Sequence, residues 1–183
     1  EIAAAFNWEV CVIKDDDMIN AFCLPGGKMA VYTGILPVTG SDAGLAVVLG
    51  HEIAHATRRH GTQRVTQGAL TQLGIDVFTQ NVEISDDESE RRAATILAEI
   101  GLSLPFSRDH EIEADSLGLI YMATAGYDPR EAVGFWQRMA SNGADNTPEW
   151  LSTHPSSSNR IRQIRLLLPE VMPIYEASRH ALR

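Results

Sequence analysis

The sequence predicts an α+β fold that is mainly helical, with a small N-terminal β-sheet and a pair of helices that carry a polar site. Runs with strand composition come first, before residue 34, and helical patterns dominate the rest of the chain. The chain has 183 residues, of which 44% are hydrophobic and 21% charged, enough to bury a core. We therefore expect one domain spanning residues 1–183.

The sheet is expected to contain three short strands, over residues 8–13, 21–24 and 29–33. An Asp-rich turn at residues 15–17 separates the first two strands. The Pro-Gly-Gly sequence at residues 25–27 separates the second from the third.

The two cysteines fall in the first two predicted strands. If these strands form a hairpin centred on the Asp-rich turn, Cys11 faces Cys23. Directly opposed strand positions bring the Cα atoms within disulfide reach. We predict a disulfide between them; the alternative is a pair of free cysteines in a reducing compartment.

The helices that follow have recognisable start and stop signals. Ser41 can cap a first helix and Gly61 can end it. Asp128, Pro129 and Glu131 supply a capping residue, a first-turn proline and an acid at the capping-box position. The remaining helices are expected near residues 62–80, 91–103, 107–126, 129–141, 157–168 and 170–181.

The first helix contains a His-Glu-x-x-His motif. The rings of His51 and His55 lie about 40° apart around the helix and one turn apart along it, so both can reach one metal ion. Glu52 lies about 100° from His51, where it can act as general base on a metal-bound water. This pattern is typical of zinc peptidases. The alternative is a partly exposed helix whose histidines and glutamate are solvated.

A third metal ligand is expected on a later helix, because catalytic zinc usually has three protein ligands. Helical spacing puts Glu111, Asp115 and Gly118 on one face and turns Glu113 about 160° away. We predict Glu111 as the ligand and Asp115 as acceptor of the free N–H of a ligating histidine. Gly118 would let the two helices lie close together. The alternative is an acidic surface helix with nothing bound.

These motifs resemble the zinc metallopeptidase family that contains HtpX and the CAAX prenyl proteases, peptidase family M48. The resemblance extends to residues 20–22, 25–27, 153–155 and 160–161. It implies a zincin-like metalloprotease domain of the gluzincin type. In such a domain one zinc ion would be held by His51, His55 and Glu111, with Glu52 as the base.

The resemblance also implies that His154 and Arg160 lie near the active site, and we take both as candidate catalytic residues. His154 sits in a loop-like stretch over residues 143–158, just before a helix expected to start around Pro155. As a donor it would stabilise the oxyanion of the tetrahedral intermediate. As a fourth ligand it would hold the enzyme off, because catalytic zinc needs an open position. An ordinary loop histidine is the third alternative.

Composition narrows the partners. The net charge is −9 and no long basic cluster occurs, which argues against nucleic acid. No stretch approaches the roughly twenty apolar residues that span a bilayer. The chain starts without Met or a signal core, so we expect a processed product whose anchor, if any, lies in an absent N-terminal segment. The resemblance to soluble periplasmic members predicts the bacterial periplasm or cell envelope.

The sequence thus predicts a zinc-dependent endopeptidase with polypeptide substrates, which could add as a further strand to the edge of the sheet. The resemblance points to quality control of unfolded or misassembled envelope proteins. One alternative is a chaperone-like binding module kept inactive by the His154 loop. The other is a metal hydrolase acting on small acyl groups. Neither the oligomeric state nor a particular substrate is predicted.

Overall fold

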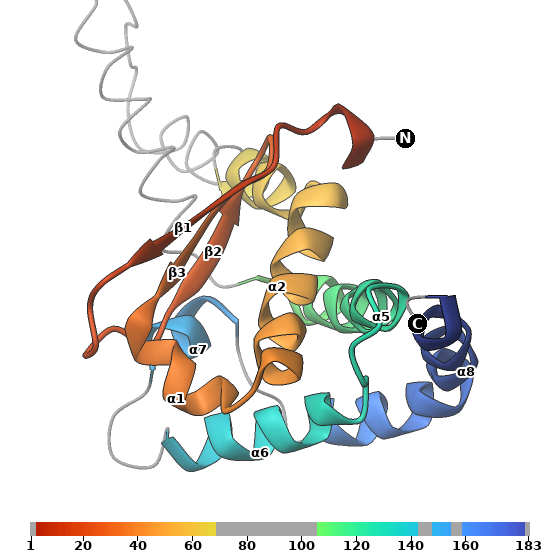
Figure 1. Ribbon diagram of the computed structural model, residues 1–183. Helices are drawn as coiled ribbons and strands as arrows, with labels where there is room; N and C mark the ends of the chain where they lie inside the picture. The colour runs from red at the N-terminus through yellow and green to blue at the C-terminus, as the bar shows by residue number, and fades with distance from the viewer. Residues whose placement is uncertain (1–2, 69–105, 143–147, 155–158, 182–183) are drawn as a thin grey trace, which may run out of the picture.

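The computed structural model describes residues 3–68, 106–142, 148–154 and 159–181. A small sheet lies on one side of the central helix α2, and helices α5, α6 and α8 lie beyond it (Figure 1). The strands are β1 (Glu9–Ile13), β2 (Ala21–Leu24) and β3 (Lys28–Tyr32). The helices are η1 (Ala3–Ala5), η2 (Thr33–Ile35), α1 (Leu36–Thr39), α2 (Asp42–Thr57), a segment over 60–68, α5 (Arg108–Thr124), α6 (Glu131–Asn142), α7 (Glu149–Thr153) and α8 (Arg160–Ala181).

The mainly helical α+β prediction is confirmed, and each predicted strand agrees with the structure to within one residue at either end. The order of the strands is β1-β3-β2, with β3 parallel to β1 and antiparallel to β2. Gly26 and Gly27, with φ of 94° and 93°, form the tight turn that makes β2 and β3 the hairpin. This arrangement leaves β2 at an edge of the sheet, facing α2.

The predicted disulfide is wrong because β3 lies between the two cysteine strands. Cys11 pairs with Ala30 and Cys23 with Met29, so the cysteines lie opposite consecutive residues of β3. Consecutive strand residues point to opposite faces of a sheet. Both cysteines are free, which agrees with this register.

The predicted start of the histidine helix is confirmed, and its predicted end is wrong. Ser41 caps α2 by accepting a hydrogen bond from the backbone N–H of Gly44 at 3.0 Å. The helix ends at Thr57, and Arg59 takes the left-handed conformation, with φ of 59°. The chain turns there, and Gly61 lies inside the helical segment that follows.

Three later predictions need correction. The helices expected over 157–168 and 170–181 are one helix, α8, which continues through Pro169 and Pro173. The stretch expected to be a loop contains α7, which Trp150 anchors by complete burial and by a backbone bond to Ile19 at 3.2 Å. The side chain of Glu131 accepts a hydrogen bond from Arg138, at 2.7 Å, in place of closing a capping box.

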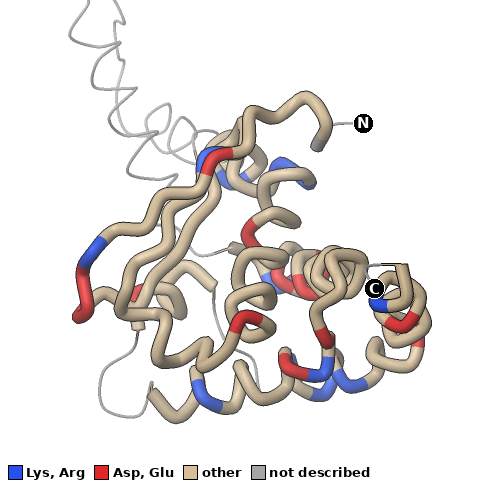
Figure 2. The backbone as a smooth tube through the Cα atoms, viewed as in Figure 1, with Lys and Arg blue, Asp and Glu red and all other residues tan. Residues whose placement is uncertain are grey.

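The core lies between the sheet, α2, α5, α6 and α8. It is built from buried apolar side chains that include Val31, Ile35, Val48, Leu119, Met122, Phe135, Trp136, Met139, Trp150 and Ile164. Acidic and basic residues are interspersed along the surrounding elements (Figure 2).

Among the described helices, no single one is long and apolar enough to cross a membrane. The segments Thr33–Thr39 and Asp42–Thr57, which meet at a bend of 118°, reach that length and apolar composition only when taken together. The helix expected over 91–103, and most of that over 62–80, lie outside the described residues.

Helices α2 and α5 approach each other closely at two glycines, which confirms the predicted use of Gly118. A Cβ atom on Gly118 would lie 2.9 Å from the backbone N of His51. A Cβ atom on Gly50 would lie 2.7 Å from the carbonyl oxygen of Gly118. The two helices therefore touch backbone to backbone at the residue that precedes the His-Glu-x-x-His motif.

Candidate metal centre

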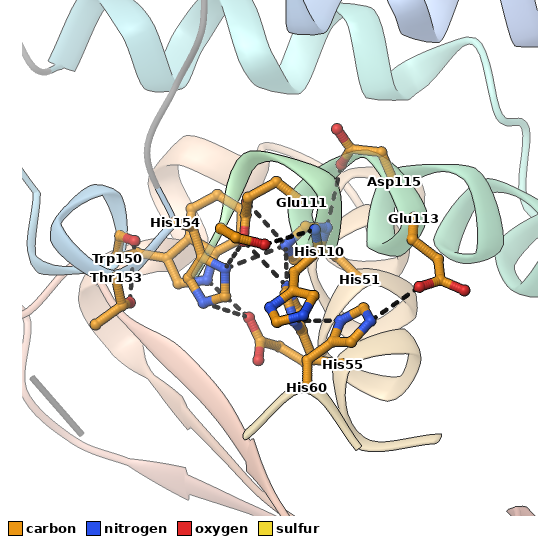
Figure 3. A network of polar contacts seen from close by, with 12 residues as sticks. His51, His55, His60, His110, Glu111, Glu113, Asp115, Trp150, Thr153 and His154 are labelled. Carbon is orange, nitrogen blue, oxygen red and sulfur yellow. Dashed lines mark hydrogen bonds and ion pairs between the residues drawn. The ribbon is translucent and has the colours of Figure 1, made fainter. Parts of the chain in front are cut away.

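Four side chains from three segments meet between α2, α5 and the end of α7. They are His51 and His55 of α2, Glu111 of α5, and His154, which follows α7 (Figure 3). One ligand atom from each lies within 4.8 Å of all the others, and all four residues are buried. Their donor set is three imidazoles and one carboxylate.

The spacing of these atoms fits a metal ion. The Nε2 atoms of His51 and His55 are 3.0 Å apart, and His55 Nε2 is 3.2 Å from Glu111 Oε1. His154 Nδ1 lies 3.2 Å from His51 Nε2 and 3.1 Å from Glu111 Oε1. Ligands about 2.0–2.1 Å from a tetrahedral zinc ion lie roughly 3.3 Å from one another. The four residues could therefore hold a tetrahedral ion.

Asp115 and Arg160 support the cluster from the side of α8. Asp115 Oδ1 is 3.1 Å from His51 Nδ1, the ring nitrogen that points away from His55. Arg160 donates from Nε to Asp115 at 2.5 Å and from Nη1 to Glu111 at 2.5 Å. Only 2% of Arg160 is exposed, and its guanidinium lies 3.7 Å above the ring of Trp136. Arg160 thus joins both carboxylates from within the core.

Glu52 lies beside the cluster and is not one of its four members. Its Oε1 accepts a hydrogen bond from the indole N–H of Trp150 at 2.9 Å and lies 3.3 Å from His154 Nε2. Both of these partners come from α7 or the residue that follows it. The position of Glu52 is therefore tied to the position of α7.

A cavity of about 720 Å³ opens onto the cluster. One wall is the edge strand β2, and the other walls come from α2, the helical segment over 60–68 and α7. Glu52, His55 and His154 line it, whereas Arg160 is absent from its lining. A long substrate could thus reach the cluster from the open edge of the sheet.

Most of the chain matches a known protein family. The model described as peptidase family M48 matches residues 2–167 of the chain. The chain belongs to peptidase family M48. The predicted resemblance is thereby confirmed at the level of the family.

Curated M48 relatives come from mitochondria and from bacteria. The chain is 40% identical over 174 residues to the mitochondrial metalloendopeptidase OMA1 of Schizosaccharomyces pombe, covering 94% of this chain and 50% of that protein. It is 38% identical over 174 residues to the Arabidopsis thaliana protein of that name, covering 92% and 34%. It is 28% identical over 174 residues to the beta-barrel assembly-enhancing protease of Yersinia pestis, covering 91% and 36%. The chain thus spans a third to a half of these relatives.

The charges of this M48 site depend on one another. Burial by itself would lower the pKa of His51, but Glu111 and Asp115 raise it to about 9. Burial lowers the pKa of His55 well below its usual value, and a hydrogen bond to Glu111 opposes this only in part. Burial raises the pKa of Glu111, but His51 and His154 outweigh it and hold the carboxyl ionised. The cluster therefore keeps an anionic carboxylate among its imidazoles.

Three aromatic neighbours of the M48 cluster were not predicted. Trp150 was missed because it lay in a stretch assigned to a loop. Phe106 stacks on the ring of His55 with the centroids 3.9 Å apart, and nothing local in the sequence indicates this contact. His60 lies beside His55, with Nδ1 atoms 3.0 Å apart. The spacing of five residues could have suggested this pair, had the turn at Arg59 been foreseen.

Proposed function

We propose that this chain carries the active site of a zinc-dependent endopeptidase. The observation that carries the proposal is the convergence of His51, His55 and Glu111 at the separation expected for zinc ligands, with Glu52 beside them on the cavity. Imidazole and carboxylate ligands suit zinc among the common divalent ions. Membership of family M48 supports the same reaction class.

In the proposed mechanism, His51, His55 and Glu111 would hold the zinc ion, which would supply Lewis acidity toward the substrate carbonyl and a water molecule. Glu52 accepts the proton of that water and returns it to the leaving amine. The indole N–H of Trp150 occupies Oε1 of Glu52, which leaves Oε2 for the proton. Asp115 accepts the Nδ1–H of His51 and so keeps its Nε2 lone pair directed at the cluster.

We propose that the substrate is a polypeptide in extended conformation, bound along β2. This strand lies at an edge of the sheet and lines the cavity. Addition of a strand uses backbone hydrogen bonds, so binding would depend little on side chains and would favour unfolded segments. Such breadth suits quality control of misassembled proteins, which we place in the bacterial cell envelope. A cavity that runs along a strand favours a peptide over a small acyl substrate.

The proposed function predicts that activity requires the metal. We expect about one zinc ion per chain, and cleavage of casein that disappears with a chelator and returns when zinc is added back. Metal content and casein cleavage should be measured on the same preparation. Equal cleavage by the metal-free protein would contradict the proposal.

We further propose that His154 gates the site: by acting as a fourth metal ligand, it would keep the enzyme inactive until it moves away. Its Nδ1 lies as near to Glu111 and His51 as these ligands lie to each other, in the position of a fourth ligand. A fourth protein ligand closes the position that water or substrate needs. The segment of α7 would then have to move before substrate could bind.

His154→Ala tests the gate. We expect this variant to cleave casein several times faster than the wild type, because the fourth ligand position is freed for water. Turnover and zinc content should be compared, with Thr153→Ala as a control, since Thr153 lines the same cavity next to His154. Loss of turnover with zinc retained would instead assign His154 to stabilising the oxyanion.

A further inference from the structure

His60 is a buried histidine outside the metal cluster, and only 1% of it is exposed. Its Nδ1 lies 3.0 Å from Nδ1 of His55, and its Nε2 lies 3.1 Å from Oε2 of Glu113 (Figure 3). Glu113 is the glutamate that helical spacing turned away from the metal face of α5. These contacts join a candidate ligand to a carboxylate that takes no part in the cluster.

If His55 binds a metal, the donor and acceptor of each hydrogen bond between His55, His60 and Glu113 are fixed. His55 directs Nε2 at the cluster, 3.2 Å from Glu111, so its Nδ1 must carry the hydrogen. That hydrogen needs an acceptor, and Nδ1 of His60 is within reach. His60 then carries its own hydrogen on Nε2 and donates it to the carboxylate of Glu113. Each ring is thereby fixed as one tautomer.

We propose that His60 is a positioning residue that orients the metal ligand His55, with Glu113 as the acceptor that fixes its tautomer. This inference rests on the proposed role of His55 as a zinc ligand. Ligating histidines commonly donate their second ring N–H to a carboxylate, a carbonyl or a water. His51 does so directly to Asp115. Among the described residues no carboxylate contacts Nδ1 of His55, and the His60 ring spans the distance to Glu113.

The backbone before His60 makes a turn that places this ring against His55. Arg59 is the one non-glycine residue with positive φ among those that the structure describes, and it directly precedes His60. Its left-handed turn ends α2 and brings His60 back against His55, one helical turn beyond the motif. His110 of α5 stacks on a face of the His60 ring, with ring centroids 4.3 Å apart. The His60 ring is thus held at its Nδ1 edge by His55 and on one face by His110.

The test compares zinc affinity in two variants of His60. His60→Phe keeps an aromatic ring for stacking but removes the acceptor, and we expect zinc affinity to fall roughly 10–100-fold. His60→Asn places an amide oxygen near the position of Nδ1, and we expect it to restore affinity to within a few-fold of the wild type. Zinc affinity should be measured by competition with a zinc chelator. Thermal unfolding of the metal-free variants should be measured as well, so that a loss of affinity can be told apart from a loss of stability.

Glu113→Leu provides a second test that leaves the buried ring in place, because Glu113 is partly exposed. We expect a several-fold loss of zinc affinity, against no change for Arg58→Gln, which removes the other partner of Glu113. Wild-type affinity in His60→Phe, or an equal loss in His60→Phe and His60→Asn, would overturn the inference. A wild-type protein that bound no zinc would instead overturn the proposed function itself.

Discussion

Glu52→Gln is expected to lower casein cleavage by roughly 10²–10⁴-fold, the usual contribution of a general base, with no change in zinc content. Glu52 is not among the four clustered side chains, so the substitution leaves the proposed ligands intact. The amide oxygen of Gln can still accept the hydrogen bond that Trp150 donates at 2.9 Å. The change thus removes the proton acceptor and little else.

A matched control is available in the same cavity. Glu149 also lines the cavity, but it is exposed and is not among the clustered residues. Glu149→Gln should therefore retain cleavage close to that of the wild type. Zinc content and turnover should be measured for all three proteins together. Bound zinc without cleavage in any of them would favour the closed binding module, and full activity of Glu52→Gln would reject Glu52 as the base.

Arg160→Met is expected to destabilise the metal-free protein by about 3–5 kcal/mol, the usual result of removing one partner of a buried ion pair. Arg160 donates hydrogen bonds to Asp115 and Glu111, and all three side chains are buried. Without the guanidinium, Asp115 and Glu111 would lose these hydrogen bonds, and His51, whose pKa is raised to about 9, would be left to balance both carboxylates. The expected loss is large because neither carboxylate can turn to water.

Denaturant unfolding of the metal-free protein measures this effect, with Arg162→Met as the control. Arg162 lies on the same helix and is exposed, so its substitution should change the free energy of unfolding by no more than about 0.5 kcal/mol. Unfolding of Arg160→Met at the wild-type denaturant concentration would contradict the expectation. Such a result would mean that the hydrogen bonds of Arg160 to Asp115 and Glu111 contribute little to the stability of the metal-free protein.

Helical geometry predicted that His51 and His55 share one helix face and that Glu111 and Asp115 share another, and the structure brings these four side chains together. Each pair lies on a single helix with a spacing of four residues: His51 with His55, and Glu111 with Asp115. Local sequence therefore decides that the members of each pair share a face. The predicted partnership of Asp115 with a histidine matches the 3.1 Å approach to His51. What these residues do chemically stays a prediction.

The errors lie where the outcome depends on distant parts of the chain. The order of the strands could not be read from turns alone, because β3 pairs with both β1 and β2. Helix α7 is too short for a periodic pattern, and the burial of Trp150 against α2 and α6 decides its conformation. Pro169 suggested a helix end, yet α8 continues through it because tertiary packing outweighs local preference. Whether residues 1–183 form one domain also stays a prediction.

The contact between Gly50 and Gly118 sets the distance between the two helices that carry the candidate metal ligands. The backbones already touch there, so α2 and α5 cannot approach further, and any added side chain would act as a wedge. Such a wedge would carry Glu111 away from His51 and His55 while leaving every ligand in the sequence. The affinity of the site for the ion would then depend on the distance between α2 and α5, although no ligand had been changed.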